Sequence, residues 1–518
     1  MNPELKKWLI DDFSINISNE LKNFFFDELF KLKNVINSNN YESYIKNNIN
    51  NLLFIVHKFS REPWVFQKDI SDQLNISKDE LINLNKIIRA SVFFQKLIIK
   101  EGIANKYWNS IIPFSKKTEK VLNNEYSFPL RIALFPGVSC MFFCGFCGRN
   151  QSAKYPLNII ESSNSFYKDI FFSKESKNTA FSISGGLEPL TNPKLGDIIK
   201  NASEAGIKIP LITNGFSLTE NYLKANPGLW KLDSLRVSLY GVDIDSYNFI
   251  TRVPKSFEIV KKNVINFLTN RNIINKNLKF GFNFIIIPEN IDQLSSVLDL
   301  IKDINGQVKN GEGVNFLTLR DDYQSVTGNN NNFDKERKYK LESIMGTAER
   351  KKLLYVIKEF NKKKNSVCPN TYVDFGYSLE SLSKGVFDKG LIKVKSNNMR
   401  KYGFTQLSVA IDLNCDVFLF REAGFLNRKG NEKMIIGRIS ENNSLQDIIK
   451  NFLSNNESLV FDEDDSRFMD SFDHVLTMLV NQSENDKKFG VAFDLGPVVA
   501  RSIEKKMSLG NNWYSDDI

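Results

Sequence analysis

The sequence predicts an α/β protein whose centre is an incomplete β/α barrel of six repeats, preceded by an all-α segment and followed by an α+β extension. Two observations lead to this prediction. From about residue 129 onward, short β-rich runs alternate with amphipathic helical stretches, which is typical of a parallel sheet with right-handed crossovers. A cysteine-rich loop, residues 137–149, directly follows the first of these runs. Ligands collect at the C-terminal ends of the strands in such folds.

The composition is that of a folded globular protein. Of the 518 residues, 42% are hydrophobic and 25% are charged, which excludes wholesale disorder. This length allows two or three domains, or one large barrel with extensions. The net charge of +9, from 69 basic and 60 acidic residues, is small for so long a chain. This charge favours an anionic ligand. The sequence has no basic stripe with interleaved aromatic residues, so it does not predict nucleic-acid binding.

The N-terminus and the cysteine count indicate a cytoplasmic protein with no membrane partner. Asp11 and Asp12 stand where a secretory signal would have its apolar region. No stretch approaches the ~18 apolar residues of a membrane span. The five cysteines, an odd number, do not form a secreted disulfide framework. We therefore expect the clustered cysteines to act as ligands in a reducing compartment.

Residues 1–125 are predicted to form a helical domain. Apolar residues recur at helical spacing in its first half. Ser77, followed by Glu80 just before an apolar-periodic run, predicts a helix start with a capping box. His57 lies on an apolar helix face, where a packed histidine is more common than a ligand. The domain is expected to be a scaffold or a lid.

Residues 126–330 are predicted to form the partial barrel. Helical stretches such as 194–205 and 257–269 separate its β-rich runs. The expected strands are residues 131–135, 179–184, 208–213, 234–239, 280–287 and 314–319. Site residues are expected in the loops that follow these strands.

Residues 331–518 are predicted to form the α+β extension. Its expected elements are a long polar helix at 334–364, a strand at 372–377, and a hairpin of 407–411 and 417–420 turned at 413–416. Cys415 is interpreted as a turn residue.

Cys140, Cys144 and Cys147 have the spacing C-x3-C-x2-C. Three thiolates this close in sequence can hold one metal centre, because each is a soft anionic ligand. Thiolates usually hold a four-iron cluster by four ligands, so three would leave one iron open to a ligand that is not protein. The alternative is a structural zinc site, which needs a fourth ligand. The candidates for it are all distant in sequence: His57, Cys368, Cys415 and His474.

The ends of the next three expected strands carry residues suited to an amino-acid group. Gly185 and Gly186 let the backbone approach a ligand closely, and Glu188 offers a carboxylate to an ammonium group. Asn214 follows the third strand. The fourth strand carries two possible carboxylate partners, Arg236 and Ser238. Together they describe a receptor for an α-amino acid, although the Gly-Gly segment alone could be an ordinary β-to-α turn.

The motif C-x3-C-x-aromatic-C, followed by G-G-x-E-P on the second strand, resembles the radical S-adenosylmethionine (SAM) superfamily. The resemblance implies one [4Fe-4S] cluster on Cys140, Cys144 and Cys147, whose free iron chelates the amino and carboxylate groups of SAM. The implied SAM-binding residues are Phe146 near the adenine, Gly185, Gly186 and Glu188 at the ammonium, Arg236 and Ser238 at the carboxylate or ribose, and Asn214. The isolated Cys368 and Cys415 cannot complete a second four-thiolate site.

Within this superfamily the chain is similar to the deaminases of deoxysugar biosynthesis. The matching segments beyond the cofactor motifs include L-R-D-D-Y at 319–323, D-F-G-Y at 374–377, R-E-A-G-F at 421–425 and F-M-D-S-F-D at 468–473. The similarity implies a lyase in which a 5′-deoxyadenosyl radical removes hydrogen from C3 of a nucleotide-linked 4-amino-4,6-dideoxy sugar. Ammonia then leaves C4, giving a 3-keto sugar. A flavodoxin or ferredoxin type electron donor is also implied.

The same similarity supplies candidates for the substrate side. They are Glu422, Asp322 and Tyr377 as general base near the 3-hydroxyl, Arg320 and Arg421 as guanidinium forks for the diphosphate, and Tyr323 as a further substrate contact. Two alternatives stay open. Arg421 and Glu422 could form an internal ion pair that braces the hairpin. The C3 radical could also lead to oxidation, epimerisation or dehydration of a related nucleotide sugar or aminosugar.

Overall fold

The structure, a computed structural model, describes Lys7 and residues 41–100, 103–144, 147–148, 153–287, 289–321, 348–387, 391, 394–455 and 459–491. Contacts divide these residues into two compact units. Unit 1 holds the described residues within 1–118, 380–392 and 478–512, and unit 2 holds those within 119–379 and 393–477. The sequence predicts three domains that are consecutive along the chain. Unit 1 instead combines the N-terminal segment with residues from 380–392 and 478–512. No helix of the described part is long and apolar enough to cross a membrane.

Unit 1 is helical. Its helices are α4 (Tyr41–Arg61), α5 (Gln67–Leu74), α6 (Lys78–Ala90), α7 (Val92–Lys100), α8 (Ala104–Ser115), α18 (Glu380–Ser383) and the later part of α20 (Ser471–Phe489). Ser77 caps α6 by accepting a hydrogen bond from the Glu80 amide at 3.2 Å, at the predicted helix start. The C-terminal helix joins this unit, because Asp486 accepts from the Gln67 amide at 2.9 Å. Burial lowers the pKa of His57 to about 4, as expected of a packed histidine.

Unit 2 contains a sheet whose ten described strands follow the order β10-β9-β8-β1-β2-β3-β4-β5-β6-β7. The strands are β1 (Arg131–Phe135), β2 (Ala180–Ile183), β3 (Pro210–Thr213), β4 (Ser234–Leu239), β5 (Lys279–Ile286), β6 (Phe316–Asp321), β7 (Tyr372–Phe375), β8 (Ser408–Asp412), β9 (Asp416–Phe418) and β10 (Ile435–Arg438). All neighbouring pairs from β8 through β1 to β7 are parallel. β9 pairs antiparallel with both β8 and β10. The predicted class, a partial parallel barrel with a helical N-terminal region, is confirmed.

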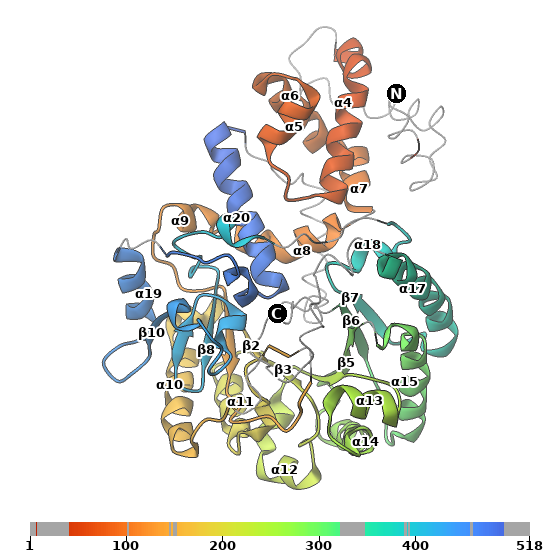
Figure 1. Cartoon of the computed structure of the whole chain (residues 1–518), viewed down its shortest axis with the longest axis vertical. Coiled ribbons are helices and arrows are strands. Elements are labelled where there is room, and N and C mark those ends of the chain that lie inside the picture. Colours follow the sequence, from red (N-terminus) through yellow and green to blue (C-terminus); the bar gives the residue numbers. More distant parts are fainter. Residues whose placement is uncertain are drawn as a thin grey trace. The chain divides into compact units, whose positions relative to one another are not determined.

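Helices cover the outer face of this sheet (Figure 1). The described helices of unit 2 are α9 (Thr118–Leu122), α10 (Ile160–Phe172), α11 (Leu195–Glu204), α12 (Glu220–Ala225), α13 (Ile244–Thr251), α14 (Ser256–Ile274), α15 (Ser296–Gln307), α17 (Ala348–Val367), α19 (Leu445–Ser454) and the start of α20. Phe280 of β5 contacts Phe267 of α14, and Phe375 of β7 contacts Phe360 of α17. Because strand side chains alternate between faces, the residues next to these aromatics lie on the inner face.

The C-terminal strands extend the barrel sheet at both edges. β7 pairs with β6, and β8 pairs with β1, so the extension is continuous with the barrel sheet. The predicted hairpin is present as β8 and β9, and Cys415 in its turn has a φ of +62°. The Tyr155 hydroxyl donates to Asp412 Oδ2 at 2.6 Å, which ties the turn to the segment after the cysteine loop. The polar helix is α17, and residues 334–347 of its predicted range lie outside the described part.

Candidate active site

The cysteine loop leaves the C-terminal end of β1, as predicted. Hydrogen bonds fix its first residues to the segment after β2, since the amides of Val138 and Ser139 donate to Thr191 Oγ1 at 2.9 and 3.0 Å. Cys144 is buried, while Cys140 and Cys147 are partly exposed. The loop is therefore anchored at its base, and two of its cysteines are partly exposed.

The three thiols gather around one tyrosine. Burial raises the pKa of Tyr240, and the nearby thiols of Cys144, Cys140 and Cys147 raise it further. Among the described residues, no three His, Cys, Asp or Glu side chains lie close enough to hold a single metal ion. In a four-iron cluster each thiolate binds a different iron, so the three thiolates need not meet around a single ion. A donor set of three thiols on one loop fits a cluster with one iron left to another ligand.

Gly185 and Gly186 follow β2 with positive φ angles of +85° and +61°. Such angles favour glycine. A Cβ on either residue would also lie within 3 Å of Phe135, at 2.8 and 2.9 Å. Gly424 of the R-E-A-G-F segment packs against the same phenylalanine ring. The Phe135 side chain therefore brings the predicted cofactor and substrate segments next to each other.

Glu188 is buried and accepts three protein hydrogen bonds. Its donors are the Leu190 amide at 3.1 Å, the Asn214 amide at 2.8 Å and the Thr213 hydroxyl. Burial raises the pKa of this carboxyl, and the hydrogen bonds oppose the rise. A carboxylate has about four acceptor sites, so it retains capacity for one further donor such as an ammonium group. The carboxylate also connects the end of β2 to the end of β3.

Asn214 lies beside the cysteine loop. Its side-chain amide is 3.8 Å from Cys140 Sγ and 3.1 Å from Met141 Sδ. Arg236 and Ser238 are buried on β4, and the Arg236 guanidinium lies 5.5 Å from the centre of the Phe316 ring. Phe146 lies outside the described residues.

Arg421 joins the extension to the barrel. Its Nη1 donates to Asp470 Oδ2 at 3.0 Å, and its Nη2 donates to Ser184 Oγ next to Gly185. Glu422 does not pair with Arg421. It pairs with Arg428, whose Nη1 lies 3.5 Å from Glu422 Oε2. The internal Arg421–Glu422 pair considered from the sequence is thus replaced by two separate pairs, because η8 (Arg421–Gly424) directs the neighbouring side chains to different partners.

Arg428 links Glu422 to the cysteine loop. Burial lowers the pKa of Arg428, and the charges of Glu422 and, more weakly, Cys147 oppose this change. Glu422 is therefore paired with a buried arginine, and the charge of Cys147 acts on the same arginine.

Asp470 and Asp473 belong to the F-M-D-S-F-D segment but are not among the predicted site residues, and they hold the start of α20. The Asp473 amide donates to Asp470 Oδ1 at 2.8 Å, and the Asp470 amide donates to Asp473 Oδ2 at 3.3 Å, which is a reciprocal capping box. Although burial opposes ionisation, Arg131 and Arg421 hold the pKa of Asp470 below its usual range. Burial and the charge of Asp470 raise the pKa of Asp473. The D-x-x-D spacing was the signal available in the sequence.

The other substrate-side candidates are only partly placed. Arg320 on β6 donates to Ser471 Oγ at 3.2 Å, which brings it to the start of α20. Tyr377 is buried just after β7. Asp322 and Tyr323 lie outside the described residues.

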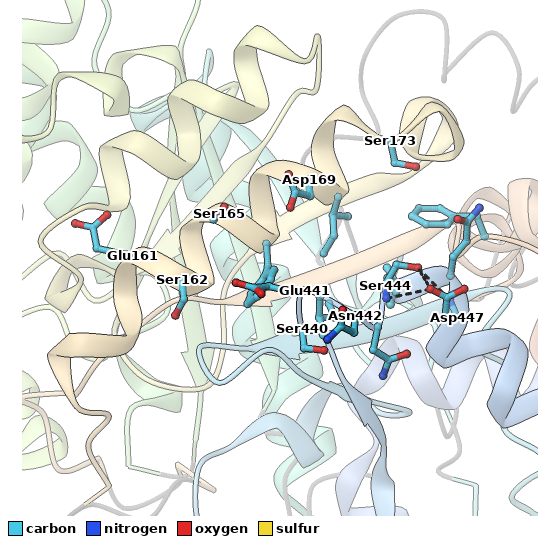
Figure 2. Close-up of a pocket in the computed structure, with 17 residues that line it drawn as sticks. Glu161, Ser162, Ser165, Asp169, Ser173, Ser440, Glu441, Asn442, Ser444 and Asp447 are labelled. Carbon is cyan, nitrogen blue, oxygen red and sulfur yellow. Dashed lines mark hydrogen bonds between the residues drawn. The ribbon is translucent and has the colours of Figure 1, made fainter.

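A separate pocket of about 810 Å³ lies between α10 and residues 439–447 (Figure 2). Its charged lining residues are acidic: Glu161, Asp169, Glu441 and Asp447. Asp447 is engaged in a capping box with Ser444. The lining includes none of the residues predicted for the site, and its charge does not suit a diphosphate.

Comparison with known proteins gives three kinds of match. Residues 134–301 match the family model described as "Radical SAM superfamily". The dTDP-4-amino-4,6-dideoxy-D-glucose ammonia-lyase of Streptomyces venezuelae is 30% identical over 443 residues, which cover 85% of this chain and 88% of that protein. The crystal structure of SuiB from Streptococcus suis aligns with a TM-score of 0.39 and 18% identity, covering 69% of this chain and 73% of SuiB. The structure of anSMEcpe with bound AdoMet aligns with a TM-score of 0.41 and 13% identity, covering 73% and 99%.

Proposed function

The chain belongs to the radical SAM superfamily, and from this premise we propose that it is a lyase that eliminates ammonia from a nucleotide-linked 4-amino-4,6-dideoxy sugar. Enzymes of this family use SAM and an iron-sulfur cluster. The observation that carries the proposal is the 30% identity to a dTDP-aminosugar ammonia-lyase over 443 residues. That match reaches far beyond residues 134–301, which carry the superfamily match. A protein that shared only SAM chemistry would not be expected to match along its C-terminal extension.

The cofactor would be held at the β1–β4 end of the sheet. Cys140, Cys144 and Cys147 would hold one cluster, and the remaining acceptor capacity of Glu188 would receive the ammonium of SAM. Arg236 and Ser238 would serve its carboxylate or ribose. When bound, SAM and the reduced cluster supply the radical that removes a hydrogen atom from C3 of the sugar. The electron comes from a flavodoxin or ferredoxin type donor.

The protein's own residues would accept one proton from the substrate and bind the substrate in position. Once the C3–H bond is broken, the 3-hydroxyl gives its proton to a base, the C4–N bond breaks and ammonia leaves. C3 becomes a carbonyl carbon, and C4 regains one hydrogen atom, as a proton and a second electron from the same type of donor. Glu422 is our candidate base, because its buried carboxylate lies on the segment that packs against Gly185 and Gly186 through Phe135.

Arg421 and Arg320 would orient the diphosphate. Guanidinium groups form bidentate hydrogen bonds with phosphate, and a buried arginine held by Asp470 is already oriented. Arg320 lies at the end of β6, on the same side as the start of α20. We propose that these two arginines approach the nucleotide from different elements.

Anaerobic incubation of the reconstituted, reduced protein with SAM and dTDP-4-amino-4,6-dideoxyglucose tests the proposal. We expect ammonia and a 3-keto product in equal amounts. Consumption of the sugar without ammonia would contradict the lyase and favour a dehydrogenase, epimerase or dehydratase. Glu422→Gln, which keeps the size but removes the base, should lower ammonia formation by about 10²-fold or more. It should leave SAM binding unchanged.

A further inference from the structure

A row of polar side chains crosses the inner face of the sheet. We call it the polar row, and it consists of Ser238 on β4, Asn283 on β5, Thr318 on β6 and Asp374 on β7. Each residue is the in-register partner of the next. Partners on neighbouring parallel strands point to the same face of a sheet. All four residues are buried. The flanking aromatics, such as Phe375, contact the helices outside, so the polar row faces the interior.

Two members of the polar row have unused hydrogen-bonding capacity. Asn283 is 4% exposed and Thr318 is fully buried. Within the described part of the chain, neither Asn283 Oδ1 nor Thr318 Oγ1 has a hydrogen-bond partner. Burying such a polar atom unpaired costs about 1–3 kcal/mol, and folded proteins contain few of them. These atoms are therefore expected to meet a ligand or water in the interior.

An aromatic ring lies next to the polar row, toward the N-terminal ends of the strands. Two residues before the row on each strand, Arg236, Gly281 and Phe316 are in-register partners. The Phe316 ring occupies the space that a side chain at Gly281 would fill, and Arg236 lies over this ring. A ligand on the polar row would thus contact an aromatic surface. Arg320 lies two residues after Thr318 on β6.

The near end of the polar row reaches the cysteine loop. Thr213 of β3 pairs with Val237, so Asn214 and Ser238, which follow them, are neighbours at the strand ends. The Asn214 amide lies 3.8 Å from Cys140 Sγ. The polar side chains therefore continue from the expected cofactor position across the interior to Asp374.

We propose that three members of the polar row, Asn283, Thr318 and Asp374, bind the sugar ring of the substrate, with the Asp374 carboxylate facing the 4-ammonium group. This inference rests on the proposed function and adds the residues that recognise the sugar. Amide, hydroxyl and carboxylate groups match the hydroxyls and amine of an aminosugar. Two strand spacings separate Asn283 from Asp374, about 10 Å, which accommodates one ring with its substituents. Ser238, the fourth member, is left to SAM.

Binding to reconstituted full-length protein tests the assignment. Isothermal titration would compare dTDP-4-amino-4,6-dideoxyglucose, dTDP-glucose and dTDP. Thr318→Val keeps the shape but removes the hydroxyl, and should weaken both sugar nucleotides about tenfold while leaving dTDP unchanged. Asp374→Asn should weaken the aminosugar nucleotide about tenfold or more and have little effect on dTDP-glucose, which has no ammonium group.

Three comparisons keep the result interpretable. Thr371→Val is the matched control, because Thr371 is a buried threonine off the polar row whose hydroxyl donates to the Val314 carbonyl at 3.4 Å. It should bind all three ligands as the wild type does. Thr318→Ser, which keeps the hydroxyl, should restore affinity. SAM binding should be unchanged in every variant, which would show that the cofactor site is intact.

Two outcomes would overturn the inference, and they differ. If the wild type prefers the aminosugar nucleotide over dTDP and releases ammonia, but Thr318→Val and Asp374→Asn bind it normally, water fills the polar row and the sugar binds elsewhere. If the wild type itself neither distinguishes the aminosugar nucleotide from dTDP nor releases ammonia, the proposed function fails, and the sugar site fails with it.

Discussion

Two parts of unit 2, the loops at the ends of β1 to β4 and an ion cluster of Arg131, Arg421 and Asp470, present their functional groups in different ways. In the first part, the groups come from short, contiguous segments, such as the cysteine loop and the Gly185–Glu188 turn. In the second part, Arg131 of β1 is joined to Arg421 and Asp470, which lie about 290 and 340 residues further along the chain. The first part is constrained mainly by backbone geometry and local hydrogen bonds. The second depends on the whole fold, so a single charge change there should disturb distant segments together.

The largest effect is expected at the cysteine end. Cys147→Ala should abolish both cluster binding and SAM cleavage, because two thiolates cannot replace three. Iron content and 5′-deoxyadenosine formation measure the two losses. Cys415→Ala is the control, since Cys415 is buried in the β8–β9 turn and burial raises the pKa of its thiol to about 12. Equal loss in both variants would contradict the assignment of the cluster to the loop.

In the ion cluster, Asp470→Asn should destabilise the protein by about 3–5 kcal/mol, because it leaves the buried guanidiniums of Arg131 and Arg421 without their carboxylate. A fall in melting temperature measures this effect. The exposed Asp464 pairs with Arg467 at 4.0 Å, so Asp464→Asn should change the melting temperature little. A melting temperature for Asp470→Asn equal to that of the wild type would show that the ion cluster is not a structural link.

A smaller effect is expected for Glu188→Gln. The variant retains one acceptor oxygen but replaces the other by an amide that cannot accept from the Asn214 or Thr213 donors. We expect SAM to bind about tenfold more weakly and stability to fall by about 1–3 kcal/mol. Glu220→Gln, at an exposed ion pair with Lys224, is the matched control. Unchanged SAM affinity would show that Glu188 stabilises the turn but does not bind SAM.

The same difference explains how much the sequence could predict. Cys140, Cys144 and Glu188 were identified because their spacing is local and chemically specific. The strands were placed closely because their β-rich runs are bounded by helical stretches. Asp470 was not assigned a role, and its partners Arg131 and Arg421 become neighbours only when β1, the hairpin and α20 are assembled. Likewise, Thr318 and Asn283 look like ordinary strand residues until the register aligns them.

Asp412 provides the smallest expected effect, and it contrasts with Asp470. Both carboxyls are buried, but Asp412 receives a hydrogen bond from the Tyr155 hydroxyl and no ion pair within the described residues. Burial raises its pKa from 3.8 to about 7, and the charge of Asp416 adds to the rise. The folded protein therefore keeps a proton that the unfolded chain loses near pH 4. Stability should fall as pH rises from about 4 to 7, and this contribution should level off above pH 7.

Asp412→Asn, which cannot ionise, should remove this part of the pH dependence. Between pH 4 and 7, the free energy of unfolding of the variant should fall less steeply with pH than that of the wild type, by at most about 1.4 kcal/mol per pH unit. Melting temperatures of wild type and variant, measured from pH 5 to 8, give the difference. Asp447→Asn serves as control, since Asp447 is exposed and its pKa is lowered by Ser444. If Asp412→Asn and the wild type show the same slope, Asp412 is ionised in the folded state, and the hairpin turn holds a buried charge as the Asp470 cluster does.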